Sequence, residues 1–166
     1  MVPRNDQLIF TSARVNSLIR YTSEDKQPLT DIYCTQLKNG KWKTPVPFSM
    51  EINSRYNEGP ISFDSAGNTV YFNRSDDNGK LKIFRSEFRN GQWQNIQELS
   101  INSNEYSLAH PSVSADGRTL FFSSDMPGGM GGKDLYVSFL EDGKWTVPEN
   151  LGTPVNTSGN ELFPFI

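Results

Sequence analysis

The fold of the chain is decided by residues 110–145, which read HPSVSADGRTLFFSSDMPGGMGGKDLYVSFLEDGKW. The short apolar runs PSVS and TLFF flank the pair Asp116-Gly117, and a later run, DLYVSFL, ends at Asp142-Gly143. Asp-Gly between apolar runs is a strong hairpin signal, because glycine takes the positive φ that tight turns require. A further run begins at Trp145. This stretch therefore predicts four short antiparallel strands.

The same pattern occurs three times, with a period of about 51 residues. Each copy contains a Gly-X-Trp triplet, and these triplets end at Trp42, Trp93 and Trp145. Each copy also contains a triplet of the Asp-Ile-Tyr type, beginning at Asp31, Lys82 and Asp134. Asn-Glu pairs ahead of a proline supply a third anchor, at Glu58, Glu105 and Glu161. Three anchors that share one period indicate a repeat architecture.

Four antiparallel strands in roughly 40–50 residues, with a recurring turn and aromatic residue, are typical of a β-propeller blade. We therefore predict an all-β fold in a single domain, residues 1–166. Its repeats lie at about 7–59, 60–110 and 111–163, and residues 161–166 begin the next blade. Because one blade cannot bury both of its faces, stacking between blades supplies the core. No window has sustained helical periodicity, which excludes a helical solenoid.

Charge and composition exclude several functional classes. Sixteen basic and nineteen acidic residues are interspersed and give a net charge of −3, which argues against a nucleic-acid binder. No apolar run approaches the length of a membrane span, so we expect no direct membrane insertion. Cys34 is the single cysteine and lies in an apolar run, so we expect a buried, unreactive thiol. The N-terminus has no signal-peptide pattern, so the protein is either not secreted or seen here in a mature or trimmed form.

The conspicuous polar residues are the repeated ones, which favours structural roles over catalysis. One carboxylate per blade, at Glu58, Glu105 and Glu161, does not suit a single active site. In the glycine-rich loop 127–133, Lys133 is followed by an aspartate, so the loop lacks P-loop spacing. We expect Asp134 to accept hydrogen bonds from the amides of this loop, and Asp31 to do the same in the first repeat. The three tryptophans are interpreted as contacts between blades rather than as a sugar platform.

No combination of residues predicts a catalytic site, a metal site or a cofactor. His110 is the single histidine and precedes the blade-opening Pro111, where its counterparts are Gly59 and Phe163, so we expect a packing role. The best candidate for a partner contact is the long connection 12–30 in the first repeat, because insertions in repeat proteins map to a binding face. The residues predicted to bind a partner are Arg14, Arg20, Tyr21 and Glu24.

The third repeat also contains the motifs PENLG at 148–152 and VNT at 155–157, followed by Asn160-Glu161. With these motifs, the repeat closely resembles the WD40-like propeller repeat of TolB-type proteins, as found upstream of OmpA-type domains in Bacteroidetes cell-envelope proteins. The resemblance covers essentially the whole chain and is weaker in the second repeat, where Lys82 replaces the expected aspartate. It implies a six-bladed propeller in the periplasm or at the outer membrane, associated with outer-membrane or secretion machinery. No segment of this chain resembles the OmpA-type domain, so peptidoglycan binding is not implied.

Three blades are half of a six-bladed ring, which leaves three arrangements open. The chain is a fragment of a longer propeller, or it pairs head to tail with a second copy, or it forms an open arc on another protein. For function, we expect a non-catalytic protein-binding or scaffolding module. The alternative is a hydrolase or lyase with a site in the propeller channel. An enzyme should concentrate non-repeated polar residues on one set of loops, and the sequence lacks such a concentration.

Overall fold

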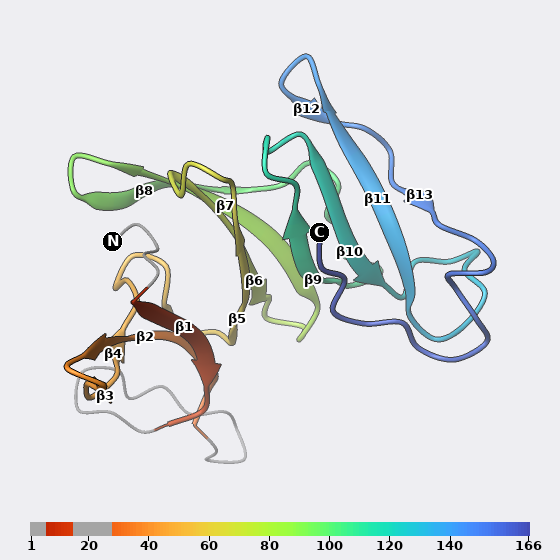
Figure 1. The fold of residues 1–166 in the computed structure, drawn as a ribbon. Coiled ribbons are helices and arrows are strands. Elements are labelled where there is room, and N and C mark those ends of the chain that lie inside the picture. The colour runs from red at the N-terminus through yellow and green to blue at the C-terminus, as the bar shows by residue number, and fades with distance from the viewer. Residues whose placement is uncertain (1–5, 15–27) are drawn as a thin grey trace.

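The computed structural model describes residues 6–14 and 28–166. These residues form three antiparallel sheets that stand side by side in chain order (Figure 1). The all-β prediction is thus confirmed, with one sheet for each repeat. Within the described ranges, no helix is long and apolar enough to cross a membrane.

Each sheet is a meander of strands that are consecutive in the sequence. The first sheet contains β1 (Gln7–Ser12), β2 (Asp31–Lys38), β3 (Lys41–Trp42) and β4 (Val46–Pro47). The second sheet contains β5 (Glu58–Phe63), β6 (Thr69–Ser75), β7 (Leu81–Arg89) and β8 (Gln92–Glu98). The third sheet contains β9 (Leu108–Val113), β10 (Thr119–Ser124), β11 (Asp134–Glu141), β12 (Lys144–Trp145) and β13 (Glu149–Asn150). Both β3 and β4 pair with β2, and both β12 and β13 pair with β11, so the outer strand is interrupted in these two sheets.

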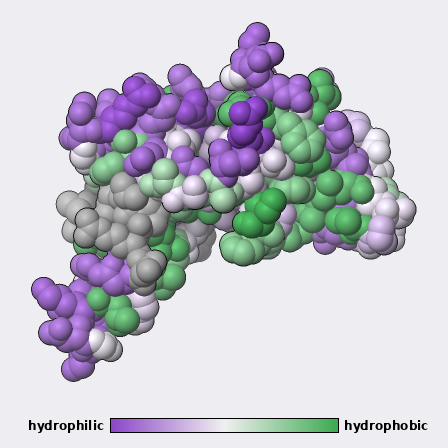
Figure 2. Space-filling model, turned by 45° about the horizontal axis from the view of Figure 1, so that its top comes forward, coloured by the Kyte–Doolittle hydropathy of each residue, from purple (hydrophilic) through white to green (hydrophobic). Residues whose placement is uncertain are grey.

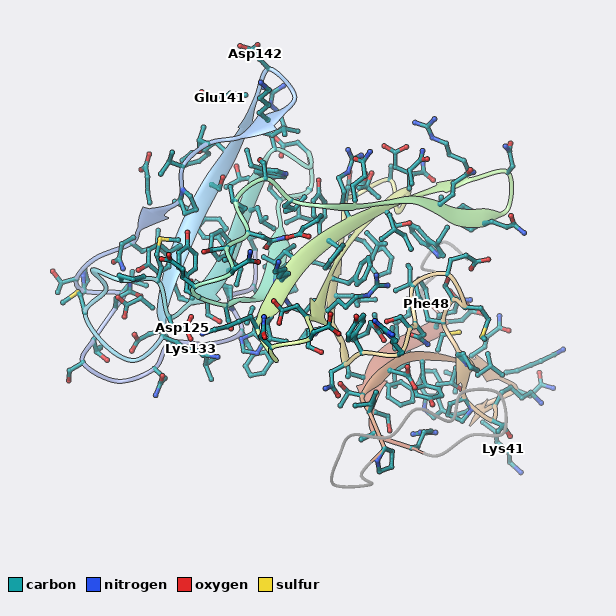
Figure 3. The ribbon with its side chains drawn as sticks, turned by 180° about the vertical axis from the view of Figure 1, so that it is seen from behind. Lys41, Phe48, Asp125, Lys133, Glu141 and Asp142 are labelled. Carbon is teal, nitrogen blue, oxygen red and sulfur yellow. The ribbon has the colours of Figure 1, made fainter. Side chains whose placement is uncertain are left out.

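The hairpins that end in tryptophan are set by turn chemistry. Both central residues of each turn have positive φ: 52° and 72° in Asn39-Gly40, 53° and 82° in Asn90-Gly91, and 47° and 77° in Asp142-Gly143. Asparagine, aspartate and glycine tolerate this conformation best, and it matches the twist of the flanking strands. These tips project away from the body of the molecule, and Figure 3 shows Asp142 at the end of the β11–β12 hairpin.

The strand boundaries differ from the predicted repeat boundaries in two places. β5 begins at Glu58 and β9 at Leu108, so both strands start before the proline at which the repeats were divided. A shift of register next to each proline lets the strand continue through it, because proline has no amide hydrogen for a regular ladder. The strand expected at 161–166 is not formed. Beside it, Asn160 makes an isolated bridge with Lys133, and within it Glu161 N donates to Lys133 O at 2.8 Å and Ile166 N to Ser112 Oγ at 3.1 Å.

Two apolar clusters fill the spaces between the sheets. The cluster between the first and second sheets is centred on Ile32, Cys34, Phe48, Ile52, Val70, Phe72 and Trp93. The cluster between the second and third sheets is centred on Tyr71, Ile83, Leu99, Ile101, Leu108, Val113, Leu120, Phe122 and Tyr136. Figure 3 shows Phe48 where the first sheet meets the second. The core is therefore made by stacking, as expected for propeller blades.

An asparagine, buried in the first and third sheets and half-buried in the second, bridges each outer connection to the central strand of its own sheet. Ile32 N donates to Asn53 Oδ1 at 3.0 Å, and Asn53 Nδ2 donates back to Ile32 O at 2.8 Å. Asn102 makes the same two bonds with Ile83, at 2.9 and 2.8 Å, and Asn156 makes them with Leu135, at 2.8 and 3.0 Å. Each bridge gives the central-strand N–H a side-chain acceptor and gives its C=O a second donor, beside the backbone N of Phe48, Leu99 or Leu151.

Candidate binding groove along the inner strands

A groove of about 590 Å³ runs along the first strands of the second and third sheets and reaches the C-terminal segment. Its lining is mainly apolar and includes Ile61, Phe63, Pro111, Val113, Phe165 and Ile166. Figure 1 places the C-terminus close to β9, and Figure 2 shows hydrophobic residues gathered on the part of the molecule that contains the third sheet and the C-terminal segment. Hydrophilic residues cover the hairpin tips instead (Figure 2).

The backbone of the groove is shaped by a positive-φ residue ahead of each of its three prolines. These residues are Gly59 (φ 114°), His110 (φ 54°) and Phe163 (φ 55°), which confirms that they are counterparts. At Gly59 an added Cβ would lie 2.1 Å from Thr11 Oγ1, so glycine alone fits there. At His110 the backbone N donates to Asn73 Oδ1 at 2.7 Å, which fixes β9 against the second sheet.

The side chain of His110 is held by packing, as the sequence suggested. Its ring stacks on Phe163 with 3.8 Å between centroids, and its Nδ1 lies 3.0 Å from Ser123 Oγ. Burial, and then the charge of Lys133, lower the pKa of His110, so the ring is neutral at pH 7. The Ser123 side chain is fully buried, so this pair does not present a nucleophile to a substrate in the groove.

The polar groups of the groove serve the backbone. Ser62 Oγ accepts a hydrogen bond from Val113 N at 2.9 Å, and Ser112 Oγ accepts one from Ile166 N at 3.1 Å. Each serine thereby ties one inner segment to the next. Among the described residues, no group of three or more His, Cys, Asp or Glu side chains could hold a metal ion. The groove thus offers an apolar concave wall with a few hydroxyl groups.

The glutamate anchors are equivalent in two repeats and not in the third. Glu58 is buried and accepts hydrogen bonds from the amide and the hydroxyl of Ser54 and from Arg74; burial outweighs these bonds and raises its pKa. Glu161 likewise accepts bonds from Thr157 N at 3.2 Å and Thr157 Oγ1 at 2.6 Å. The residue four positions after the matching Ser103 is Ser107, so the exposed Glu105 is out of register with the other two glutamates.

The correct alignment was available in a different motif. The triplets Ile-Asn-Ser, Ile-Asn-Ser and Val-Asn-Thr contain the bridging residues Asn53, Asn102 and Asn156. The Asn-Glu pair at 104–105, used above as the anchor of the second repeat, lies close to the correct triplet but two residues before the true counterpart of Glu58, which is Ser107.

The aspartates at the start of the central strands behave differently from one another. Asp134 accepts bonds from the amides of Met130 (2.5 Å) and Gly131 (3.1 Å) and from Asn150 Nδ2 (2.9 Å), as the sequence predicted for the loop amides. Burial disfavours the Asp134 carboxylate, but these bonds outweigh it and lower the pKa. Asp31 is 3% exposed and its Oδ1 has no partner, so burial raises its pKa to about 6. Its expected bonds to loop amides are therefore absent at this atom among the described residues.

The second repeat replaces this aspartate by a compensated ion pair. Lys82 Nζ lies 3.2 Å from Glu98 Oε1 and donates to Asn104 Oδ1 at 2.7 Å. Glu98 occupies the position of Asn150. The next residue in each repeat, Leu99 or Leu151, donates its backbone N–H to the equivalent carbonyl of the central strand, that of Ile83 or Leu135. The change from aspartate to lysine at position 82 is thus matched by a change from asparagine to glutamate at position 98, on the neighbouring strand.

Two of the three tryptophans contact the preceding sheet. Trp93 is 2% exposed and its ring lies 5.6 Å from that of Phe48 in the first sheet. Trp145 meets Tyr71 of the second sheet edge to face at 5.9 Å. Trp42 is 54% exposed. This confirms that Trp93 and Trp145 form contacts between blades, whereas Trp42 contacts no other sheet among the described residues.

Of the residues predicted to bind a partner, the structure describes one. The exposed Arg14 places its guanidinium carbon 5.2 Å above the centroid of the Phe10 ring and 5.0 Å above that of Tyr33. Arg20, Tyr21 and Glu24 lie outside the described residues, so their predicted role is untested. The groove itself was missed from the sequence, because its three walls lie about 51 residues apart in the chain.

Comparison with known proteins supports the fold. No protein-family model and no curated protein matches the chain. Among solved structures, a putative TolB from Agrobacterium tumefaciens is similar, with a TM-score of 0.55 and 17% identity over 93% of this chain and 50% of that one. TolB from Acinetobacter baumannii is also similar, with a TM-score of 0.52 and 13% identity over 93% of this chain and 33% of that one. The chain spans half or less of these proteins and shares with them the fold of a TolB-like propeller region.

Proposed function

We propose that the chain is a non-catalytic, protein-binding or scaffolding part of a β-propeller in the bacterial cell envelope, and that it binds its partner in the groove along the inner strands. The observation that carries this proposal is the apolar lining of the groove, whose volume is about 590 Å³. Exposed concave apolar surface on a folded domain usually marks a binding site.

The character of the lining favours a polypeptide ligand. The groove is elongated along three segments that follow one another in space, each of which includes a proline. Because proline has no backbone N–H, the wall cannot form a full ladder of hydrogen bonds with an added strand, and it offers an extended ligand mainly apolar contacts. The hydroxyls of Ser62 and Ser112 already accept bonds from neighbouring backbone, which leaves few polar groups for specificity toward a small polar molecule.

The proposal of a non-catalytic role rests on the geometry around His110. The nearest candidate nucleophile, Ser123, is fully buried, and His110 is shielded on one side by Phe163. A hydrolase would need a reachable nucleophile and an oriented base at the same place. The assignment to the cell envelope is supported by the likeness of the third repeat to TolB-type repeats and by the shared fold.

The test is site-specific photocrosslinking in living cells. A photoreactive residue at Ala115, which is exposed at the rim of the groove, should give a defined protein adduct. The matched control is the same residue at Met50, which is 58% exposed and outside the groove lining. Replacing Ile61 by Asp should abolish the adduct at position 115. Equal adducts at positions 50 and 115, or an adduct that survives the Ile61→Asp change, would refute the proposed site.

A further inference from the structure

We propose that a polar cleft between the second and third sheets is a carbohydrate-binding site, which takes a neutral, polyhydroxylated ligand. The cleft has a volume of about 430 Å³ and shares no lining residue with the inner groove, so the site is independent of what that groove binds. The second sheet forms one wall and the β11–β12 hairpin the other, where the hairpin diverges from the second sheet (Figure 1). The volume lies within the range of about 300–1,000 Å³ that is usual for small-molecule sites.

The interface between the first and second sheets shows the same place in a closed form. There Trp93 is 2% exposed and is packed in one apolar cluster with Ile9 and Cys34, which are a cross-strand pair. The equivalent cross-strand pair in the second sheet is Tyr71 and Arg85, and the tryptophan that contacts this tyrosine is only half-buried. A phenol and a guanidinium thus replace two apolar side chains, and the space beside them stays open.

Tyr71 and Arg85 both have hydrogen-bonding groups that the described residues leave unsatisfied. Tyr71 is 4% exposed, yet its hydroxyl has no hydrogen-bond partner among these residues and is not enclosed by them, so it opens into the cleft. Burial raises the pKa of Tyr71, which keeps the hydroxyl neutral and able both to donate and to accept. Arg85 donates from Nη2 to Glu87, but its Nε is buried without a partner and its side chain is still 32% exposed. Ligand oxygens can supply partners that the protein does not.

Two turns place carboxylate oxygens at the rim of the cleft. Asp64 Oδ1 accepts hydrogen bonds from two amides of its own turn, and Asp116 Oδ1 accepts from one hydroxyl and one amide of the next turn. The second oxygen of each carboxylate has no hydrogen-bond partner among the described residues. The two turns are joined, because Ser65 N donates to Ala115 O at 3.0 Å. The rim therefore offers two acceptors near the donors on the wall.

The mixture of groups indicates the chemical class of the ligand. Asp64 and Asp116 disfavour an anion, whereas Arg85 and Lys144 disfavour a cation. An apolar ligand would cover the polar groups without giving them partners, which is costly. A sugar hydroxyl both donates and accepts, and the C–H face of a sugar ring can pack on the half-buried indole of Trp145, which lines the cleft. A neutral saccharide therefore matches every group that the cleft presents.

The test begins with binding of the whole chain to a glycan array that carries neutral, acidic and amino-sugar oligosaccharides. We expect binding to neutral members, and the glycan with the strongest signal is then titrated by calorimetry. Tyr71→Phe removes only the hydroxyl and should weaken binding of this glycan about three- to tenfold. The matched control is Tyr106→Phe, because the Tyr106 hydroxyl has no hydrogen bond among the described residues and the side chain lies outside the cleft lining. This control should leave the affinity unchanged.

A second pair of variants addresses the carboxylates. Asp64→Asn keeps an oxygen for the turn amides but replaces the free acceptor by a donor, so it should weaken binding about tenfold, because bonds to a charged acceptor are strong. Asp142→Asn makes the same change at an exposed hairpin tip, where the other two hairpins already have asparagine, and should have no effect.

Thermal unfolding of the four variants should match that of the wild type, which shows that the sheets remain folded. Binding to no glycan on the array, or to acidic or amino-sugar glycans alone, would overturn the proposal. So would equal affinities for Tyr71→Phe and Tyr106→Phe, or for Asp64→Asn and Asp142→Asn.

Discussion

Replacing Asn53 by Asp tests whether the asparagine bridges hold the blades together. The change conserves shape and the acceptor oxygen that receives Ile32 N, but it removes the Nδ2 donor that reaches Ile32 O at 2.8 Å. Asn53 is 6% exposed, so water cannot replace the lost donor. The substituted carboxylate would then face a carbonyl oxygen in a buried position.

The expected loss of stability at pH 7 is about 3 kcal/mol. About 1 kcal/mol comes from the lost hydrogen bond and about 2 kcal/mol from burying the new charge beside the Ile32 carbonyl oxygen, which keeps its bond from Phe48 N at 2.9 Å. For a chain of this size, 1 kcal/mol corresponds to about 2–4 °C in Tm, so the melting temperature should fall by about 6–12 °C.

The assay is urea unfolding of wild type and variant at pH 7 and near pH 4. Burial raises the pKa of the new carboxyl in the folded state above its unfolded value of about 3.9. The destabilisation is therefore absent below the unfolded pKa and grows as pH rises through the folded pKa. The control is Asn104→Asp, because Asn104 is exposed and accepts from Lys82. A loss for Asn53→Asp no larger than for the control, or one independent of pH, would refute the bridging role.

Three further perturbations follow from the geometry. Because the folded pKa of Asp31 is about 6, the free energy of unfolding of the wild type should decline by up to about 3 kcal/mol as pH rises from about 4 to 7. Asp31→Asn should remove this decline. Parallel pH–stability curves for the two proteins would contradict this. Gly59→Ala should cost about 3 kcal/mol or more through its contact with Thr11 and its φ of 114°, whereas Gly91→Ala, with φ 82° and open space, should cost about 1 kcal/mol; equal thermal shifts would contradict it. Trp93→Ala should cost about 3–5 kcal/mol in urea unfolding and Trp42→Ala less than about 1 kcal/mol; the reverse order would show that the stacking direction is wrong.

The sequence predicted the features that depend on local chemistry. The Asn-Gly and Asp-Gly turns determine their hairpins because few other residues accept two successive positive φ angles. The Gly-X-Trp spacing located the three blades. The counterparts of His110 were also found, because proline marks the following position in every repeat.

The features that depend on long-range contacts were not accessible in this way. Glu105 resembles Glu58 in sequence, but β5 begins at Glu58 itself whereas β9 begins at Leu108, three residues after Glu105. Asp31 and Asp134 are alike in their strands and differ in their surroundings, since Asn150 supports one and Pro47 takes the equivalent place beside the other. The groove requires three segments to be adjacent in space, which no single stretch of sequence reveals.

The most direct test of the stacked-blade arrangement is acrylamide quenching of single-tryptophan variants, with the other two tryptophans changed to Phe. The structure predicts that the emission of Trp93 is shielded, that of Trp145 is intermediate and that of Trp42 is readily quenched. If Trp93 were quenched as readily as Trp42, the second sheet would not be packed on the first, and the propeller arrangement proposed for this chain would be wrong.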